Sequence, residues 1–203
     1  MHEQAVEHLR TSDRVLARLI RQVGPCRLEP HRNASPFQTL VQSVAHQQLN
    51  GTAANTILKR VRALFPRRKF PLPEELVATP NERLRQAGLS RAKIAAVKDI
   101  AAKTIEGVVP VSRAIAQMSN EEIIERLTTI RGVGPWTVEM LLVFRLGRLD
   151  ILPATDFGVR KGFALTYRLE KLPTPAELLA HGERWRPYRT IASWYLWRAL
   201  DRE

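Results

Sequence analysis

Residues 127–144 read LTTIRGVGPWTVEMLLVF, in which two apolar helical segments flank a Gly-Val-Gly-Pro break. Glycines two apart permit a sharp turn with positive φ angles between the helices. They also leave the backbone amides at the start of the second helix unshielded, where the helix dipole favours an anion. The stretch therefore predicts a hairpin that grips a phosphate through the backbone of Gly132, Val133 and Gly134, a contact that reads no base sequence. The alternative is a plain corner between helices whose glycines serve only the turn.

The chain is strongly basic. Its 203 residues include 32 Lys and Arg against 20 Asp and Glu, which gives a formal net charge of +12. Domains of this charge commonly bind polyanions, of which nucleic acid is the commonest. The basic residues are spread along the chain, which favours a folded binding face over a disordered arm. The alternative is a solvated basic surface with no partner.

Helix signals recur along the chain, and strand signals are scarce. The opening segment carries apolar residues at helical spacing until Gly24-Pro25 ends it. Ser35-Pro36, Ser90, Ser119 and Thr174-Pro175 each have residue types that begin helices. We therefore predict an all-α protein of about ten helices.

The domain organisation follows from the lack of a linker between two halves of the chain. Prolines at 66, 71 and 73 mark a loop and not an interdomain linker. Any division is therefore expected to be discontinuous, with both chain ends packing together. We expect a terminal subdomain of residues 1–34 and 145–203, and a central subdomain of residues 35–144 that contains the hairpin of residues 127–144.

The sequence also bears on the compartment and the association state. Only one cysteine, Cys26, is present, so we expect no internal disulfide and no cysteine-ligated iron–sulfur cluster. The N-terminus carries acids and arginines throughout and is not typical of a secretory signal, and no run reaches the length of a membrane helix. We expect a monomer without membrane contact, in the cytoplasm with the nucleoid of a bacterium or in a eukaryotic nucleus.

Five segments in order resemble the helix–hairpin–helix DNA glycosylase superfamily, and more closely its alkylpurine branch, the 3-methyladenine DNA glycosylase II type. They cover nearly all of the chain from residue 35 onward. The segments are SVAHQQLNGTAANTI (43–57), GLSRAKIAAVKDIA (88–101), IRGVGPWTVEMLL (130–142), LPATDFGVRKGF (152–163) and WRPYRTIASWYLW (185–197).

This resemblance implies the helix–hairpin–helix glycosylase fold, in which two helical subdomains enclose an active-site cleft, here in a minimal form without the N-terminal β domain. It implies an enzyme of base excision repair that flips alkylated purines such as 3-methyladenine or 7-methylguanine out of double-stranded DNA and removes them. Bifunctional members carry a lysine where Trp136 stands. Because tryptophan cannot form a Schiff base, the resemblance implies a monofunctional hydrolase without lyase activity.

Asp156 is the candidate catalytic residue. A carboxylate near the sugar stabilises the positive charge that builds up as an N-glycosidic bond breaks, and it can orient the attacking water. The alternative is that Asp156 only caps the following helix. The resemblance favours catalysis, although Thr155 stands where many relatives have a second acid. A single acid suits alkylated purines, since these bases already carry a positive charge and are neutralised when they leave.

The base pocket is expected to be aromatic. The resemblance points to Trp136, Trp197, Tyr188 and Met140. Met140 occupies a position that is often aromatic in the family, so lesions other than alkylated purines stay open as substrates. An electron-poor base gains stacking and cation–π energy on such walls. The alternative is that these residues belong to the core, as we expect for Trp185 and Trp194.

A flipped base leaves a gap in the duplex that an inserted side chain can fill. By resemblance this wedge is Gln48 with its neighbour Leu49, whereas the alternative for Gln48 is a helix C-cap. Candidate contacts to the DNA backbone outside the hairpin are Asn50, Thr52, Arg160, Lys161 and Arg189.

No cofactor is expected to be required. The five histidines lie far apart in sequence, so no zinc or redox site is indicated. The hairpin is a candidate site for a monovalent cation, K⁺ or Na⁺, bound by the backbone carbonyls of Thr128, Ile130 and Gly132. Two other functions stay open: a glycosylase for hypoxanthine, uracil or ethenoadenine, and a non-catalytic DNA-binding module with the same hairpin.

Overall fold

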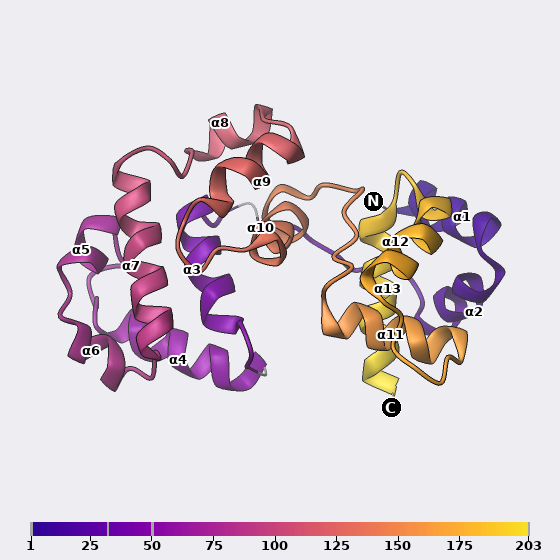
Figure 1. Cartoon of the computed structure of the whole chain (residues 1–203), viewed down its shortest axis with the longest axis horizontal. Coiled ribbons are helices and arrows are strands. Elements are labelled where there is room, and N and C mark those ends of the chain that lie inside the picture. The colour runs from indigo at the N-terminus through magenta and orange to yellow at the C-terminus, as the bar shows by residue number, and fades with distance from the viewer. Residues whose placement is uncertain (1, 32, 50, 203) are drawn as a thin grey trace. The chain divides into compact units, whose positions relative to one another are not determined.

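The computed structural model describes residues 2–31, 33–49 and 51–202, and its regular structure there is helical throughout (Figure 1). The all-α prediction is confirmed. The described residues form 13 α-helices, more than the roughly ten expected; one reason is that the opening segment, expected as one helix, is broken at Asp13. No helix in the described ranges is long and apolar enough to cross a membrane.

The chain divides into two compact units. We call Met1–Pro30 with Leu142–Glu203 the terminal unit, and His31–Leu141 the central unit. The borders expected from the sequence, after residues 34 and 144, lie a few residues C-terminal to the observed borders, which follow Pro30 and Leu141.

The terminal unit is built around its last long helix, α13 (Arg189–Ala199), which contacts α11, α2 and α1. Small or apolar residues lie on nearly every side of α13, and Ile191, Tyr195 and Leu196 are fully buried. The other elements are α1 (Glu3–Ser12), α2 (Arg14–Val23), the π-helix η1 (Leu142–Leu146), α11 (Phe157–Tyr167), α12 (Pro175–Gly182) and the 3₁₀ turns η2 (Glu183–Trp185) and η3 (Leu200–Arg202).

A buried carboxylate separates α1 from α2 and ties three distant segments of the terminal unit together. Asp13 Oδ1 accepts the amides of Val15 and Leu16, both at 3.0 Å, and so caps α2. Its Oδ2 lies near the ring or hydroxyl donors of Tyr167, His181 and Trp185. Burial alone would raise the pKa of Asp13, but the hydrogen bonds, that from His181 foremost, outweigh it and hold the pKa far below its usual range.

The central unit packs around α7 (Arg91–Ile105), which contacts α3 and α5 most extensively. Its core includes Leu40, Val97, Ile100 and Leu127. Ile105, in the last turn of α7, is 53% exposed. The other elements are α3 (Pro36–His46), α4 (Gly51–Ala63), α5 (Pro73–Ala78), α6 (Asn81–Gln86), α8 (Ser112–Gln117), α9 (Asn120–Thr128) and α10 (Pro135–Leu141).

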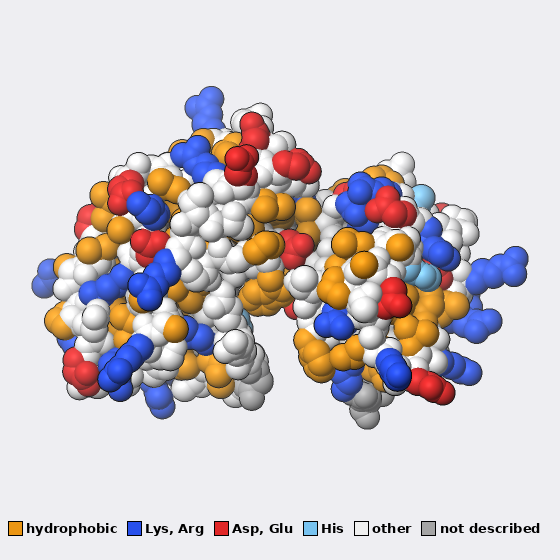
Figure 2. All heavy atoms as spheres, viewed as in Figure 1, with side chains coloured by type: hydrophobic (Ala, Val, Ile, Leu, Met, Phe, Trp, Pro, Cys, Tyr) orange, Lys and Arg blue, Asp and Glu red, His pale blue; other side chains and the backbone are white. Residues whose placement is uncertain are grey.

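Helix starts agree with the expected caps. The side chains of Ser35, Ser90, Ser119 and Thr174 each accept an amide three residues on, and the last two form capping boxes with Glu122 and Glu177. Lys and Arg side chains are scattered over the visible face of each unit and do not gather in one patch (Figure 2).

Candidate active site

The hairpin of the central unit consists of α9, a tight turn and α10. The Ile130 amide donates to the Leu127 carbonyl at 3.2 Å and the Val133 amide to the Ile130 carbonyl at 3.0 Å, which folds the turn. The Arg131 amide donates to the carboxylate of Asp99 on α7 at 2.7 Å, so α7 holds the turn in place. Because its amide is already bonded, Val133 is a weaker candidate for phosphate contact than the two glycines beside it.

The two glycines of the turn have different reasons to be glycine. Gly132 has a φ of 75°, and a Cβ at this position would lie 2.6 Å from the Cβ of Ala96 on α7. The fold itself therefore requires Gly132. Gly134 has no positive φ, and a Cβ there would meet no atom within 4 Å, so packing does not require glycine. The open space at Gly134 would let a ligand approach the backbone closely.

The expected wedge lies in the turn after α3. Gln48 is exposed and has a φ of 57°, a left-handed conformation uncommon for a residue other than glycine. Leu49 is 40% exposed. This turn thus presents one polar and one apolar side chain to solvent. The C-cap of α3 is Gln47, so capping does not explain Gln48.

Two residues that the sequence did not single out fasten this turn. The Gln47 side-chain amide donates to the Gly132 carbonyl at 3.0 Å and lies 2.9 Å from the Thr137 hydroxyl, so it links the wedge turn to the hairpin. Lys93 Nζ donates to the carbonyls of Ala45 and Gln47, both at 2.8 Å. Burial lowers the pKa of Lys93. Sequence gives no signal for these contacts, because each joins segments far apart in the chain.

Two expected pocket residues share one face of α10. Trp136 is half-buried and Met140, one turn later, is 7% exposed. Both belong to the central unit.

The expected catalytic residue lies in the terminal unit at the start of α11. Asp156 caps this helix, since its Oδ1 accepts the Val159 amide at 2.8 Å. The same oxygen accepts a hydrogen bond from the indole Nε1 of Trp197 at 2.9 Å. Both side chains are half-buried. The structure therefore brings together the carboxylate and one aromatic residue that the sequence proposed separately, from α11 and α13.

Trp197 is itself held by an aromatic neighbour. The ring of Phe144, on η1, stacks on the indole with centroids 5.5 Å apart and planes 28° apart. One face of the indole is thus covered, so a base would stack on the other face.

Tyr188 is not brought to this pair. It lies at the N-cap of α13, whereas Trp197 lies in the last turn, about 13 Å along a helix of this rise. Its ring contacts the edge of His8, with centroids 5.4 Å apart. The geometry gives Tyr188 a packing role between α1 and α13.

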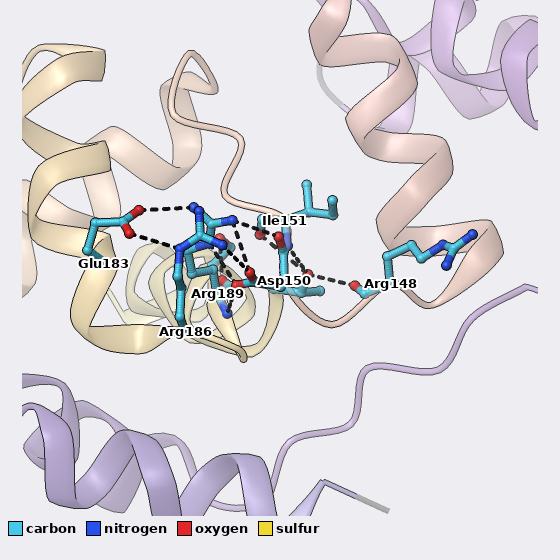
Figure 3. A network of polar contacts seen from close by, with 8 residues as sticks. Arg148, Asp150, Ile151, Glu183, Arg186 and Arg189 are labelled. Atoms are coloured by element: carbon cyan, nitrogen blue, oxygen red, sulfur yellow. Dashed lines mark hydrogen bonds and ion pairs between the residues drawn. The ribbon is translucent and has the colours of Figure 1, made fainter. Parts of the chain in front are cut away.

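Arg189, a candidate phosphate contact, is engaged within the terminal unit. Its Nε donates to Asp150 Oδ1 at 2.7 Å and its Nη2 to Oδ2 at 3.1 Å, a two-pronged ion pair that Arg186 and Glu183 extend (Figure 3). The Arg189 side chain is only 13% exposed. The network fixes residues 148–151 against the start of α13 and leaves little of this guanidinium for DNA.

The other candidate phosphate contacts have mixed surroundings. Arg160 Nε donates to the Pro173 carbonyl at 2.8 Å, which also uses part of this group. Lys161 is half-buried, and Thr52, in the first turn of α4, is exposed. Asn50 lies outside the described residues.

The core expectation for the late tryptophans is half right. Trp185 is fully buried, but Trp194 is only half-buried and has the guanidinium of Arg198 over its ring, 5.8 Å from the centroid.

Comparison with known proteins places these features in a wider group. The family model described as HhH-GPD superfamily base excision DNA repair protein matches residues 41–187. DNA-3-methyladenine glycosylase 1 of Schizosaccharomyces pombe is 43% identical over 194 residues, which are 94% of this chain and 84% of that protein.

Two solved structures are similar over almost the whole chain. The S. pombe 3-methyladenine DNA glycosylase Mag1 in complex with abasic DNA has a TM-score of 0.91 and 42% identity, covering 96% of this chain and 95% of that one. A DNA-3-methyladenine glycosidase of Bacillus halodurans has a TM-score of 0.81 and 35% identity, covering 96% and 88%.

Proposed function

Because this chain belongs to the HhH-GPD superfamily of base excision DNA repair proteins, we propose that it is a monofunctional DNA glycosylase that removes alkylated purines. The observation that carries the proposal is Asp156, a half-buried carboxylate oriented by Trp197 in a chain that resembles 3-methyladenine glycosylases along nearly its full length. The substrate class is that of bases alkylated at N3 or N7.

The reaction breaks the bond between C1′ of the deoxyribose and the purine nitrogen. The bonding electrons leave with the base, which neutralises the positive charge of the alkylated ring. Asp156 stabilises the oxocarbenium character left on the sugar. A water molecule then adds to C1′ and gives up a proton, with Asp156 as the nearest acceptor. The products are the free base and an abasic site.

Trp136 is the reason for proposing a monofunctional enzyme, one without lyase activity. Where bifunctional relatives have a lysine that attacks C1′, this chain offers an indole, which cannot form an imine. Trp197, which is hydrogen-bonded to Asp156, is proposed to contact the extruded base. By resemblance, Trp136 and Met140 on α10 are the other candidates for contact with the base.

DNA binding is assigned mainly to the central unit. Gly132 and Gly134 are proposed to meet a phosphate through their backbone, and Gln48 with Leu49 to fill the gap left by the base. Thr52 and Lys161 are secondary backbone contacts. DNA with damaged bases is the proposed partner of a monomeric protein that works where the chromosome is, in the nucleoid or the nucleus.

A monovalent cation, K⁺ or Na⁺, is proposed at the carbonyls of Thr128, Ile130 and Gly132. The Ile130 carbonyl already accepts the Val133 amide and the Gly132 carbonyl accepts Gln47, so a cation would use the second lone pair of each oxygen. Replacing KCl by tetramethylammonium chloride at constant ionic strength should weaken DNA binding if the cation matters. Equal affinity in both salts would rule the site out.

The test of the proposed function is a chromatographic census of the bases released from methylated DNA, with undamaged DNA as control. We expect release of 3-methyladenine, 7-methylguanine or both. DNA that contains hypoxanthine, uracil or ethenoadenine is tested in the same way. Release of one of these bases without release of methylated purines would identify that base as the substrate instead. Release of nothing would favour a binding module.

A further inference from the structure

We infer that Gly158 and Trp197 are positioning residues, and that the missing side chain of Gly158 is what lets the Trp197 indole reach and orient the catalytic carboxylate of Asp156. This inference rests on the proposed function, because it assigns the two residues a role in that reaction.

Gly158 lies in the first turn of α11, directly beneath the Trp197–Asp156 hydrogen bond. A Cβ at this position would lie 3.0 Å from Trp197 Cδ1, 3.2 Å from Trp197 Nε1 and 3.1 Å from Asp156 Oδ1. All three atoms belong to the hydrogen-bonded pair or to the indole edge that makes it. To make room for a methyl group there, the indole edge or the carboxylate would have to move by a few tenths of an ångström, which would disturb the hydrogen bond whose donor and acceptor are now 2.9 Å apart.

The backbone conformation does not explain this glycine. Gly158 is not among the glycines with positive φ, and it lies within a helix, where alanine is the better helix former. The space that the indole edge occupies is therefore the reason that remains for glycine here.

Two further contacts restrict the movement of the indole and the carboxylate. Phe144 covers one face of the indole, and the Val159 amide holds the same Asp156 oxygen that Trp197 binds. With the indole fixed by Phe144 and Gly158, and Oδ1 fixed by two donors, the carboxylate has one preferred rotamer. Catalytic groups that must meet a reacting carbon lose rate steeply when displaced by an ångström.

The inference separates two roles for Trp197. A stacking wall needs only an aromatic face, whereas a positioning residue needs the indole N–H. Trp197→Phe keeps a ring against Phe144 and removes the donor. Trp194→Phe, on the same helix and also half-buried, is the matched control.

The experiment measures single-turnover release of the alkylated base and, separately, affinity for DNA with an abasic-site mimic. We expect Trp197→Phe to slow release roughly tenfold or more, in line with the loss of a hydrogen bond to a charged group, while affinity stays within about twofold. Gly158→Ala should slow release in the same direction, and the Trp194→Phe control should match wild type. The melting temperature of Gly158→Ala, measured beside its activity, shows whether the variant is folded under the assay conditions, so that slower release in a folded variant is not attributed to misfolding.

The double variant Gly158→Ala/Trp197→Phe provides the decisive comparison. If Gly158 acts mainly through the indole N–H, alanine costs less once that donor is gone, so the loss in the double variant is smaller than the two single losses combined. A purely structural role for Gly158 would give additive losses and would overturn the inference.

An independent readout does not depend on activity. The chain has four tryptophans, and the indole ¹⁵N–¹H signal of Trp197 is identified by its disappearance in Trp197→Phe. This signal should shift in Gly158→Ala and stay unchanged in Trp194→Phe; an unmoved signal overturns the inference.

The failures of the two proposals are distinguishable. If wild type releases alkylated bases and Trp197→Phe does so equally fast, the positioning inference is wrong and the proposed function stands. If wild type releases no base from any damaged DNA, the proposed function fails and the positioning role fails with it.

Discussion

The side-chain amide of Gln47 donates a hydrogen bond to the backbone carbonyl of Gly132, 3.0 Å away, and so joins the exposed wedge turn to the glycine turn of the hairpin. The turn proposed as the wedge and the turn proposed to bind phosphate are therefore directly linked within the central unit.

Gln47→Leu removes this link while keeping a side chain of similar volume. Each lost neutral hydrogen bond costs about 1 kcal/mol, so affinity for DNA with an abasic-site mimic should fall roughly fivefold or more. Fluorescence polarisation measures this, with Gln42→Leu on the same helix as control. Unchanged affinity in Gln47→Leu would mean that the link does not serve binding.

The two hairpin glycines should respond differently to alanine. Gly132→Ala places a Cβ in a left-handed conformation and against Ala96, so the free energy of unfolding should fall by about 2–3 kcal/mol. Gly134→Ala should leave stability unchanged but weaken DNA binding, because its methyl group stands where a phosphate approaches. Denaturant titration and DNA titration separate the two effects. Normal DNA affinity in Gly134→Ala would contradict the backbone grip.

Asp13 should make stability depend on pH. Its pKa is depressed in the folded state, so its contribution is present above the unfolded pKa of about 4 and is lost as the pH falls toward the folded pKa. Asp13→Asn should lower the free energy of unfolding by about 2–4 kcal/mol at pH 7. The gap between wild type and variant should shrink below about pH 4. A gap that is constant from pH 7 to pH 3 would refute the charged role of Asp13.

Because Trp136 stands where bifunctional relatives carry a lysine, we expect no covalent Schiff-base intermediate between protein and DNA. Borohydride reduction during turnover should trap no protein–DNA adduct on a denaturing gel, while a bifunctional glycosylase run in parallel should give one. A strong adduct with this protein would show that another amine forms the Schiff base and that the enzyme also has lyase chemistry.

Local signals in the sequence were sufficient for the helix caps, including Asp156 at the start of α11. Ser119 with Glu122 and Thr174 with Glu177 are short-range patterns, and the structure forms both capping boxes. Asp156 stands directly before α11, so its cap could be predicted from the sequence. Its hydrogen bond from Trp197, 41 residues later in the chain, could not.

Long-range contacts could not be predicted in the same way. Lys93 and Gln47 lie in different helical segments, and nothing in either segment names the other as partner. Arg189 was expected to contact a DNA phosphate, but Asp150, 39 residues earlier in the chain, binds its guanidinium. Tyr188 was a pocket candidate by resemblance, but the length of α13 separates it from Trp197. In each case the surroundings of the residue are decided by residues that are distant in the sequence.

The central claim is that the charge of Asp156 drives base release. Asp156→Asn is the sharpest probe, because asparagine caps helices as well as aspartate and can still accept the Val159 and Trp197 hydrogen bonds. The variant removes the negative charge and little else. The measurement is single-turnover release of 3-methyladenine from alkylated DNA, alongside affinity for DNA with an abasic-site mimic. We predict a loss of release of roughly a hundredfold or more with affinity within about threefold of wild type. Release at the wild-type rate would leave Asp156 as a helix cap alone and would contradict the account.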